Sequence, residues 1–129
     1  MSFTFNKNER LHEFRLVRML FTDGHALSVP AFKVTWLRFR NQTLPFPQVM
    51  ISVPKVIQRK STDRNTIKRR IREAYRLNKS ILYDGGSSKS SDLIFCITYL
   101  SKEILTHRAI QDKIILLLRR LKEEYEKDF

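Results

Sequence analysis

The chain has 129 residues, of which 42% are hydrophobic, which fits one domain with a real core and excludes wholesale disorder. It carries 25 Lys and Arg residues against 13 Asp and Glu residues, a net charge of +12. So high a charge on a small domain indicates a polyanionic partner, either a nucleic acid or an anionic membrane surface. One cysteine allows no intramolecular disulfide, and neither a signal peptide nor a membrane-spanning run is evident. We therefore expect a cytoplasmic protein.

The first predicted element is a helix over residues 8–21. Its apolar residues recur at spacings of three or four, at Leu11, Phe14, Val17 and Leu20/Phe21. Stripes at this spacing usually face a core, so the aromatic members Phe14 and Phe21 are expected to be buried. Asp23 and Gly24 end the helix, since glycine tolerates the left-handed conformation found after helices.

Strand patterns follow. Residues 32–37 alternate apolar and polar side chains, residues 48–53 form a second strand that Pro54 stops, and a shorter extended piece over 26–29 is compatible with the sequence. The continuous apolar run at 93–99 predicts a central strand. Residues 41–47 form a connection rich in turn residues, and residues 83–91 are polar and linker-like.

Two more helices are predicted. The first covers residues 64–78 after a basic loop at 55–63 and is capped by Ser61, Thr62 or Asp63. The residues on its core side are Ile67, Ile71, Ala74 and Asn78, with Tyr75 beside them. The second begins at Ser101 or Thr106 and places these residues on its core side: Ile110, Ile114, Leu117, Leu118 and Leu121. Residues 122–129 are expected to fray. The chain therefore predicts one α+β domain over 1–129, with helices packed on a small central sheet.

The charge is concentrated in residues 55–76. This segment has nine basic and two acidic residues, so it holds +7 of the net +12. Arg64, Lys68 and Arg72 fall at i, i+4 and i+8 and share one helix face. A solvated surface is the alternative explanation for any charge run, but the scarcity of acidic residues favours a face that binds a polyanion.

Two adjacent stretches, ISVPK at 51–55 and RNTIKRRIREAYR at 64–76, resemble the signature of the bacterial ribonuclease P protein component. In that family a strand reading roughly (I/L)SVSKK leads into a helix reading roughly RNRxKRxxREAFR. Flanking matches occur at residues 10–11, at Phe21, Gly24 and Phe32, and at the DLI of residues 92–94. The resemblance covers about residues 8–121.

The resemblance implies a protein subunit that binds the catalytic RNA of ribonuclease P and the 5′ leader of precursor tRNA. Hydrolysis would be performed by the RNA with Mg²⁺, and no metal would be held by the protein. The family fold resembles the second domain of ribosomal protein S5 and includes a left-handed βαβ crossover, an exception to the usual right-handed rule. Neither a membrane nor DNA is an expected partner, and the oligomeric state is left open.

Carried over residue by residue, and extended by the helical spacing and the basic loop, the predicted RNA-binding residues are Arg64, Asn65, Lys68, Arg69, Arg72, Arg76, Lys55, Arg59 and Lys60. The candidates for a leader cleft between the first helix and the sheet are Phe21, Phe32 and the position of Val17, with Phe32 equally compatible with the core. The chain departs from the family pattern at five positions: Pro54, Val56, Thr66, Val17 and Thr35.

No catalytic centre made of protein side chains is evident. The three histidines are scattered without metal-ligand spacing, and Cys96 lies in an apolar run typical of a buried, inert thiol. Asp63 and Glu73 resemble a helix cap and an ion-pair partner. The alternative function is a basic structural or ribosome-assembly RNA-binding protein without a cleavage role. A membrane-surface role is disfavoured, because the basic helix has little apolar area.

Overall fold

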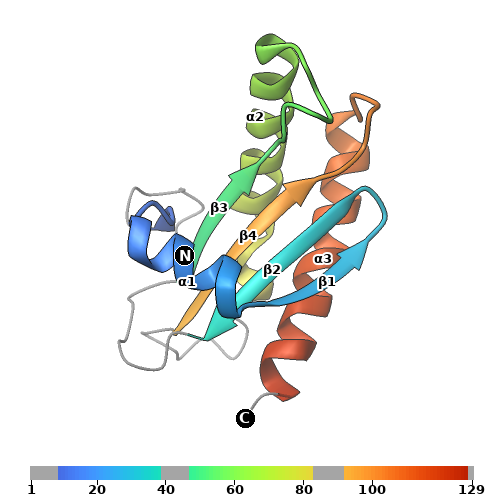
Figure 1. Ribbon diagram of the computed structural model, residues 1–129. Helices are drawn as coiled ribbons and strands as arrows, with labels where there is room; N and C mark the ends of the chain where they lie inside the picture. Colours follow the sequence, from blue (N-terminus) through green and yellow to red (C-terminus); the bar gives the residue numbers. More distant parts are fainter. Residues whose placement is uncertain (1–8, 39–46, 83–91, 128–129) are drawn as a thin grey trace.

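The computed structural model describes residues 9–38, 47–82 and 92–127 (Figure 1). Its elements in chain order are α1 (Phe14–Asp23), β1 (His25–Val29), β2 (Phe32–Arg38), β3 (Gln48–Ser52), α2 (Ser61–Asn78), the 3₁₀ helix η2 (Lys79–Ile81), β4 (Leu93–Tyr99) and α3 (His107–Lys127). The predicted α+β class and the order of the elements are confirmed. The linker predicted at 83–91 and most of the connection at 41–47 lie outside the described residues.

The four strands form one sheet in the order β1-β2-β4-β3. β2 pairs antiparallel with both β1 and β4, whereas β3 runs parallel to β4 and reaches it through α2. The view in Figure 1 fits the left-handed crossover that the resemblance implies. β4 lies between β2 and β3 as predicted, which explains why it is apolar along its whole length.

The larger core lies between the sheet and the pair α2 and α3, which cover the same face (Figure 1). From β4, Phe95 and Ile97 enter this core, and from β2 the rings of Phe32 and Trp36 do so. The predicted inner residues of both helices are buried there: Ile67, Ile71, Ala74, Tyr75, Ile110, Ile114, Leu117, Leu118 and Leu121. Asn78 is only half-buried and donates a hydrogen bond to the Ala74 carbonyl instead.

The smaller core lies on the opposite face, under α1. Leu16 and Leu20, one helical turn apart, pack against Ile94 and Cys96 of β4. The predicted helix start at residue 8 is wrong, because α1 begins at Phe14. The expected burial of Phe14 and Phe21 is also wrong, since these side chains are 77% and 54% exposed.

Gly24 ends α1 for a different reason from the one predicted. Its φ of −73° is ordinary extended backbone, not the left-handed region. A Cβ atom here would lie 2.3 Å from the Leu20 carbonyl oxygen and 3.0 Å from that of Trp36. Glycine is therefore required by the close approach of two backbone segments, not by a positive φ.

The ends of the other helices refine the prediction. α2 begins at Ser61, three residues early, with Lys60 at the N-cap and no side-chain cap, so the expected caps at Ser61, Thr62 or Asp63 are wrong. Asp63 instead lies in the first turn, where a negative charge is favoured by the helix dipole. Thr106 does cap α3, as its Oγ1 accepts a hydrogen bond from the Ala109 N–H at 3.1 Å.

α3 continues past residue 122 to Lys127, and Tyr125 near its end contacts the sheet. The Tyr125 hydroxyl donates a hydrogen bond to Asp92, and the Arg38 guanidinium lies 4.8 Å from the centre of the Tyr125 ring. Arg38 also forms a 3.0 Å ion pair with Asp92. This group joins β2, the start of β4 and α3.

Candidate nucleic-acid interface

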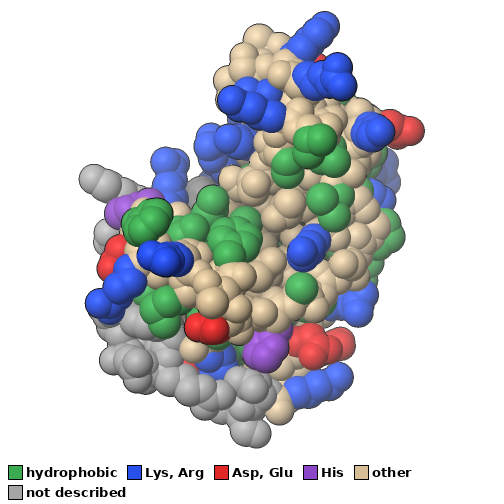
Figure 2. Space-filling view, viewed as in Figure 1, with side chains coloured by type: hydrophobic (Ala, Val, Ile, Leu, Met, Phe, Trp, Pro, Cys, Tyr) green, Lys and Arg blue, Asp and Glu red, His purple; other side chains and the backbone are tan. Residues whose placement is uncertain are grey.

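Lys and Arg side chains gather at the end of the molecule where α2 begins (Figure 2). Two segments supply the predicted cations of this region. They are the outer side of α2 and the loop between β3 and α2. This loop covers residues 53–60 and not the predicted 55–63, and we call residues 53–60 the basic loop from here on. The sequence folds this way because Ile67 and Ile71 hold one side of α2 on the sheet, which turns the interleaved basic residues outward.

Three of the six basic residues in the stretch 64–76 are engaged by the protein itself. Arg64 Nη1 donates hydrogen bonds to the carbonyls of Gln58 and Arg59, at 3.0 and 2.8 Å. Arg70 Nη1 donates to the Leu105 carbonyl at 2.6 Å. These three hydrogen bonds are to backbone carbonyls, so neither Arg64 nor Arg70 is paired with a carboxylate among the described residues, whereas the third residue, Arg76, is.

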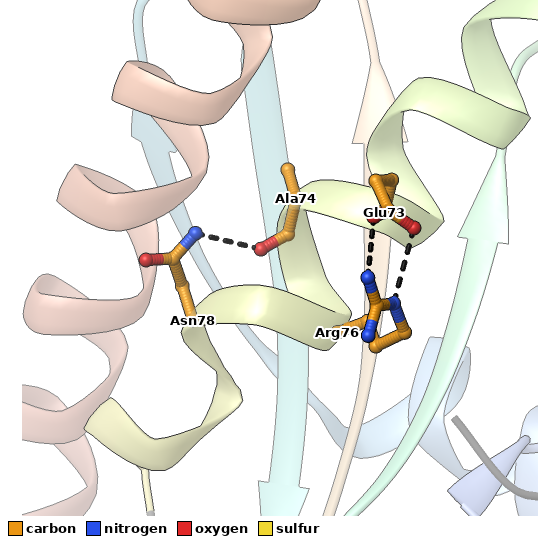
Figure 3. A network of polar contacts seen from close by, with 4 residues as sticks. All are labelled: Glu73, Ala74, Arg76 and Asn78. Atoms are coloured by element: carbon orange, nitrogen blue, oxygen red, sulfur yellow. Dashed lines mark hydrogen bonds and ion pairs between the residues drawn. The ribbon is translucent and has the colours of Figure 1, made fainter. Parts of the chain in front are cut away.

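The Arg76–Glu73 pair spans one turn of α2 (Figure 3). Two hydrogen bonds join the guanidinium to the carboxylate, one of them from Nε to Oε2 at 3.1 Å. The hydrogen bond from Arg76 lowers the pKa of Glu73, and the bond to Glu73 raises the pKa of Arg76. Glu73 is therefore the ion-pair partner that the sequence predicts, and Arg76 has less free charge to offer than its neighbours.

Six of the predicted cations make no ion pair within the described part of the chain. On α2 these are Lys68, which is half-buried, and the exposed Arg69 and Arg72; in the basic loop they are Lys55, Arg59 and Lys60, all exposed. Exposed Asn65 is the fifth residue of α2. The structure thus places the predicted RNA-binding residues along α2 and in the basic loop that leads into it, with Arg64 and Arg76 committed to other contacts.

Two departures from the family pattern have clear surroundings. Thr66 stands where the motif has a third basic residue. Its Oγ1 donates a hydrogen bond to the Thr62 carbonyl at 3.0 Å, so this side chain is bound to the backbone of α2 itself. Val56, where the motif has a second lysine, is 81% exposed in the basic loop. Neither position supplies a charge.

The predicted leader residues divide between the two faces of the sheet. Phe32 is 1% exposed in the core against α2 and α3, so its core alternative holds and its ring offers no face to a ligand. Val17, half-buried, and exposed Phe21 lie on α1, which covers part of the other face. Thr35 is buried on that face, opposite Cys96 of β4.

Sequence reasoning missed Lys33, an exposed residue of β2. It pairs with Thr98 of β4, and Ser52 of β3 pairs with the same Thr98, so a row of polar residues crosses the sheet on the α1 side. Hydrophobic side chains gather near the middle of this face in Figure 2. The alternation of side chains along β2 was the signal that could have placed Lys33 on the α1 face of the sheet, opposite the face that forms the large core.

Cys96 is buried, which raises its thiol pKa, against smaller lowering effects of Thr98 and Lys33. It is therefore not an activated thiol at neutral pH. Among the described residues there is no group of three or more His, Cys, Asp or Glu side chains that could hold a metal ion. No helix in the described ranges is long and apolar enough to cross a membrane.

A small α+β domain in which six cations of one helix and its adjoining loop make no ion pair with the described residues has the architecture of a basic, polyanion-binding protein. The family model described as Ribonuclease P matches residues 5–122, and the chain belongs to this family. The general role of the family is 5′ processing of tRNA, as the protein component of an endoribonuclease ribonucleoprotein, which implies an RNA partner.

Relatives and solved structures agree with this assignment. Ribonuclease P protein components from two strains of Porphyromonas gingivalis are 28% identical over 110 residues, which cover 85% of this chain and 80% of each relative. The RNase P protein structure from Staphylococcus aureus has a TM-score of 0.71 at 21% identity, over 88% of this chain and 95% of that one. For the Thermotoga maritima RNase P protein the TM-score is 0.68 at 23% identity, over 87% and 96%. At these identities the structures establish the fold.

Proposed function

We propose that the chain is the protein subunit of ribonuclease P, which binds the catalytic RNA and the 5′ leader of precursor tRNA. In this role it assists Mg²⁺-dependent, RNA-catalysed cleavage that leaves the mature 5′ end. The observation that carries the proposal is the group of six cations on α2 and the basic loop that make no ion pair with any described residue, in a chain of this family.

The basic end would bind the phosphate backbone of the catalytic RNA. Arg69 and Arg72 present planar guanidinium groups that match phosphate oxygens, and Lys68, one turn before Arg72, adds a point charge. Like charges one turn apart destabilise a free helix by a few tenths of a kcal/mol each, and bound phosphates would remove that repulsion. The first turn of α2 adds free N–H groups and the positive end of the helix dipole.

The face of the sheet beside α1 would receive the single-stranded leader. Phe21 exposes an aromatic ring there, and Lys33 lies exposed on the same side of the sheet. Bases of single strands stack on exposed aromatic rings while nearby cations follow the backbone. Val17 and Thr35, which stand where the family has aromatic residues, leave Phe21 as the main stacking surface among the predicted leader residues.

Mg²⁺ bound to the RNA would supply the metal chemistry of phosphodiester hydrolysis. The described side chains do not form a carboxylate-rich site of the kind that Mg²⁺ prefers in proteins. The protein's own contribution would be to neutralise closely spaced phosphates, so that the RNA needs fewer metal ions to fold and to hold its substrate.

Reconstitution at low Mg²⁺ tests the proposal. Adding the protein to the ribonuclease P RNA is expected to restore cleavage of precursor tRNA at a Mg²⁺ concentration where the RNA alone is inactive. A variant with Lys60, Arg69 and Arg72 all replaced by Ala is the matched control, and it should stimulate far less. If the protein binds the RNA without stimulating cleavage, the alternative of a structural RNA-binding protein is correct.

A further inference from the structure

The basic loop is fixed at its base by a buried glutamine. Gln58 is only 6% exposed, and its Nε2 lies 3.1 Å from the Ser101 carbonyl and 2.8 Å from that of Lys102. The Glu103 carbonyl lies further away, at 3.4 Å. One side-chain amide therefore joins the basic loop to residues 100–106, the connection between β4 and α3.

Arg64 fixes the same loop from the side of α2. Its Nη1 donates to the Gln58 and Arg59 carbonyls, which belong to the segment that carries the exposed side chains of Arg59 and Lys60. The loop is also turned on itself, because the N–H groups of Ile57 and Gln58 both donate to the Pro54 carbonyl at 3.0 Å.

Residues 100–106, to which Gln58 is hydrogen-bonded, are themselves held in place by other contacts. The Tyr99 hydroxyl donates to the Glu103 carbonyl and accepts a hydrogen bond from the Leu105 N–H at 3.2 Å. Arg70 of α2 binds the Leu105 carbonyl at 2.6 Å. Exposed Lys102 thereby stands next to the basic loop and adds a cation that the sequence pattern did not single out.

We propose that Arg64 and Gln58 are positioning residues, which hold the basic loop and its cations in the geometry that RNA requires. In this assignment Arg64, the first residue of the family motif, acts on RNA through the loop and not as a phosphate contact of its own. The inference rests on the proposed function. Its physical basis is that the long, exposed side chains of Lys55, Arg59 and Lys60 bind a polyanion more tightly when the loop backbone is ordered beforehand.

The first test is made on the free protein, by hydrogen exchange. Gln58→Leu and Arg64→Ala are each expected to speed exchange of the backbone amides at positions 57 and 58 at least tenfold. The backbone amides of Ile71 and Ala74 within α2 should keep their protection. The amides of α2 also show that each variant is folded. Unchanged exchange of the Ile57 and Gln58 amides in both variants would overturn the positioning role, whatever RNA binding shows.

The second test is a double-mutant cycle on affinity for the ribonuclease P RNA at several salt concentrations. Gln58→Leu removes no charge, yet it is expected to weaken binding about three- to tenfold, and Arg64→Ala in that background should add little. Arg69→Ala, an exposed cation of the same helix, should be fully additive with Gln58→Leu.

The opposite pattern would mark Arg64 as a phosphate contact. Gln58→Leu would then leave affinity unchanged, and Arg64→Ala would reduce the salt slope by about one, as Arg69→Ala should. A wild-type protein that fails to bind the RNA at all would remove the proposed function and the RNA role of the loop together, while the exchange result would still decide whether Arg64 and Gln58 order it.

Discussion

The two faces of the sheet differ in how completely they are covered. Toward α2 and α3, Phe32, Phe95 and Ile97 meet two helices and form the large core. Toward α1, a ten-residue helix packs mainly through Leu16 and Leu20 and leaves Phe21 and Lys33 exposed. The same strands therefore serve stability on one side and present side chains for contact on the other.

β4 shows how one sequence serves both faces. Leu93, Phe95 and Ile97 point into the large core, and Ile94 and Cys96 between them point to α1. Further along the strand the α1 side becomes polar at Thr98, beside Lys33 and Ser52, where α1 no longer covers the sheet. The difference predicts that substitutions on the two faces will have separable effects.

The largest effect is expected for Phe32→Ala, on the covered face. The ring is buried and packs edge-on against Tyr99, with ring centres 5.3 Å apart. Removing it should lower the free energy of unfolding by about 3–5 kcal/mol, as for other buried phenylalanines. Urea unfolding followed by circular dichroism would measure this. A loss below about 1 kcal/mol would show that this face does not carry the stability assigned to it.

Phe21→Ala, on the face toward α1, should affect binding and not stability. Stability should change little because the ring is half exposed, while binding of precursor tRNA to the holoenzyme should weaken by about 1–3 kcal/mol through loss of stacking. Mature tRNA, which lacks the leader, is the control substrate and should bind as before. Equal weakening for both tRNAs would exclude Phe21 from leader binding.

Asp92→Asn tests a polar contact at the edge of the large core. Burial opposes ionisation of Asp92, but hydrogen bonds from Tyr125 and Arg38 outweigh it and lower the pKa of this carboxyl group. Because the folded-state pKa is lowered, the stabilisation is present above the unfolded pKa of about 3.9 and is lost as pH falls through the folded value. The variant should be less stable by about 1 kcal/mol at pH 7, and the difference should shrink at pH 3.

Thermal melts of both proteins between about pH 7 and pH 3 would measure this change. Glu123→Gln, at an exposed position of α3, is a control for a general effect of charge. A difference between wild type and Asp92→Asn that stays constant down to pH 3 would contradict the lowered pKa.

The parts of the fold that sequence could predict are those with one strong periodic signal. The strand at 93–99 and the core side of α3 agree with the structure, because a continuous apolar run and a repeat of three and four each favour one placement. For α1 the same reasoning failed, since Phe14, Val17 and Phe21 share the spacing of a core stripe but lie on the flank of Leu16 and Leu20. Periodicity shows which residues share a side, not which side is covered.

The site was predictable as a charge distribution and not as a set of contacts. The distribution of charge along the sequence located the cations of residues 55–76. The hydrogen bonds from Arg70 to the Leu105 carbonyl and from Gln58 to the Ser101 carbonyl depend on where residues 100–106 meet α2 and the basic loop. These partners are 35 and 43 residues apart, and no local pattern reports their contact.

Arg72→Ala should have the smallest effect and is the sharpest test of the outer side of α2. The side chain is exposed and has no ion-pair partner in the described ranges, so stability should stay within about 0.5 kcal/mol. Affinity for the ribonuclease P RNA should fall only a few-fold, and the slope of log affinity against log salt should decrease by about one. Arg76→Ala is the matched control, because its charge is already shared with Glu73 and its loss should change the slope less. Equal slopes for wild type and Arg72→Ala would mean that Arg72 faces solvent in the complex and that other cations of α2 and the basic loop carry the phosphate contacts.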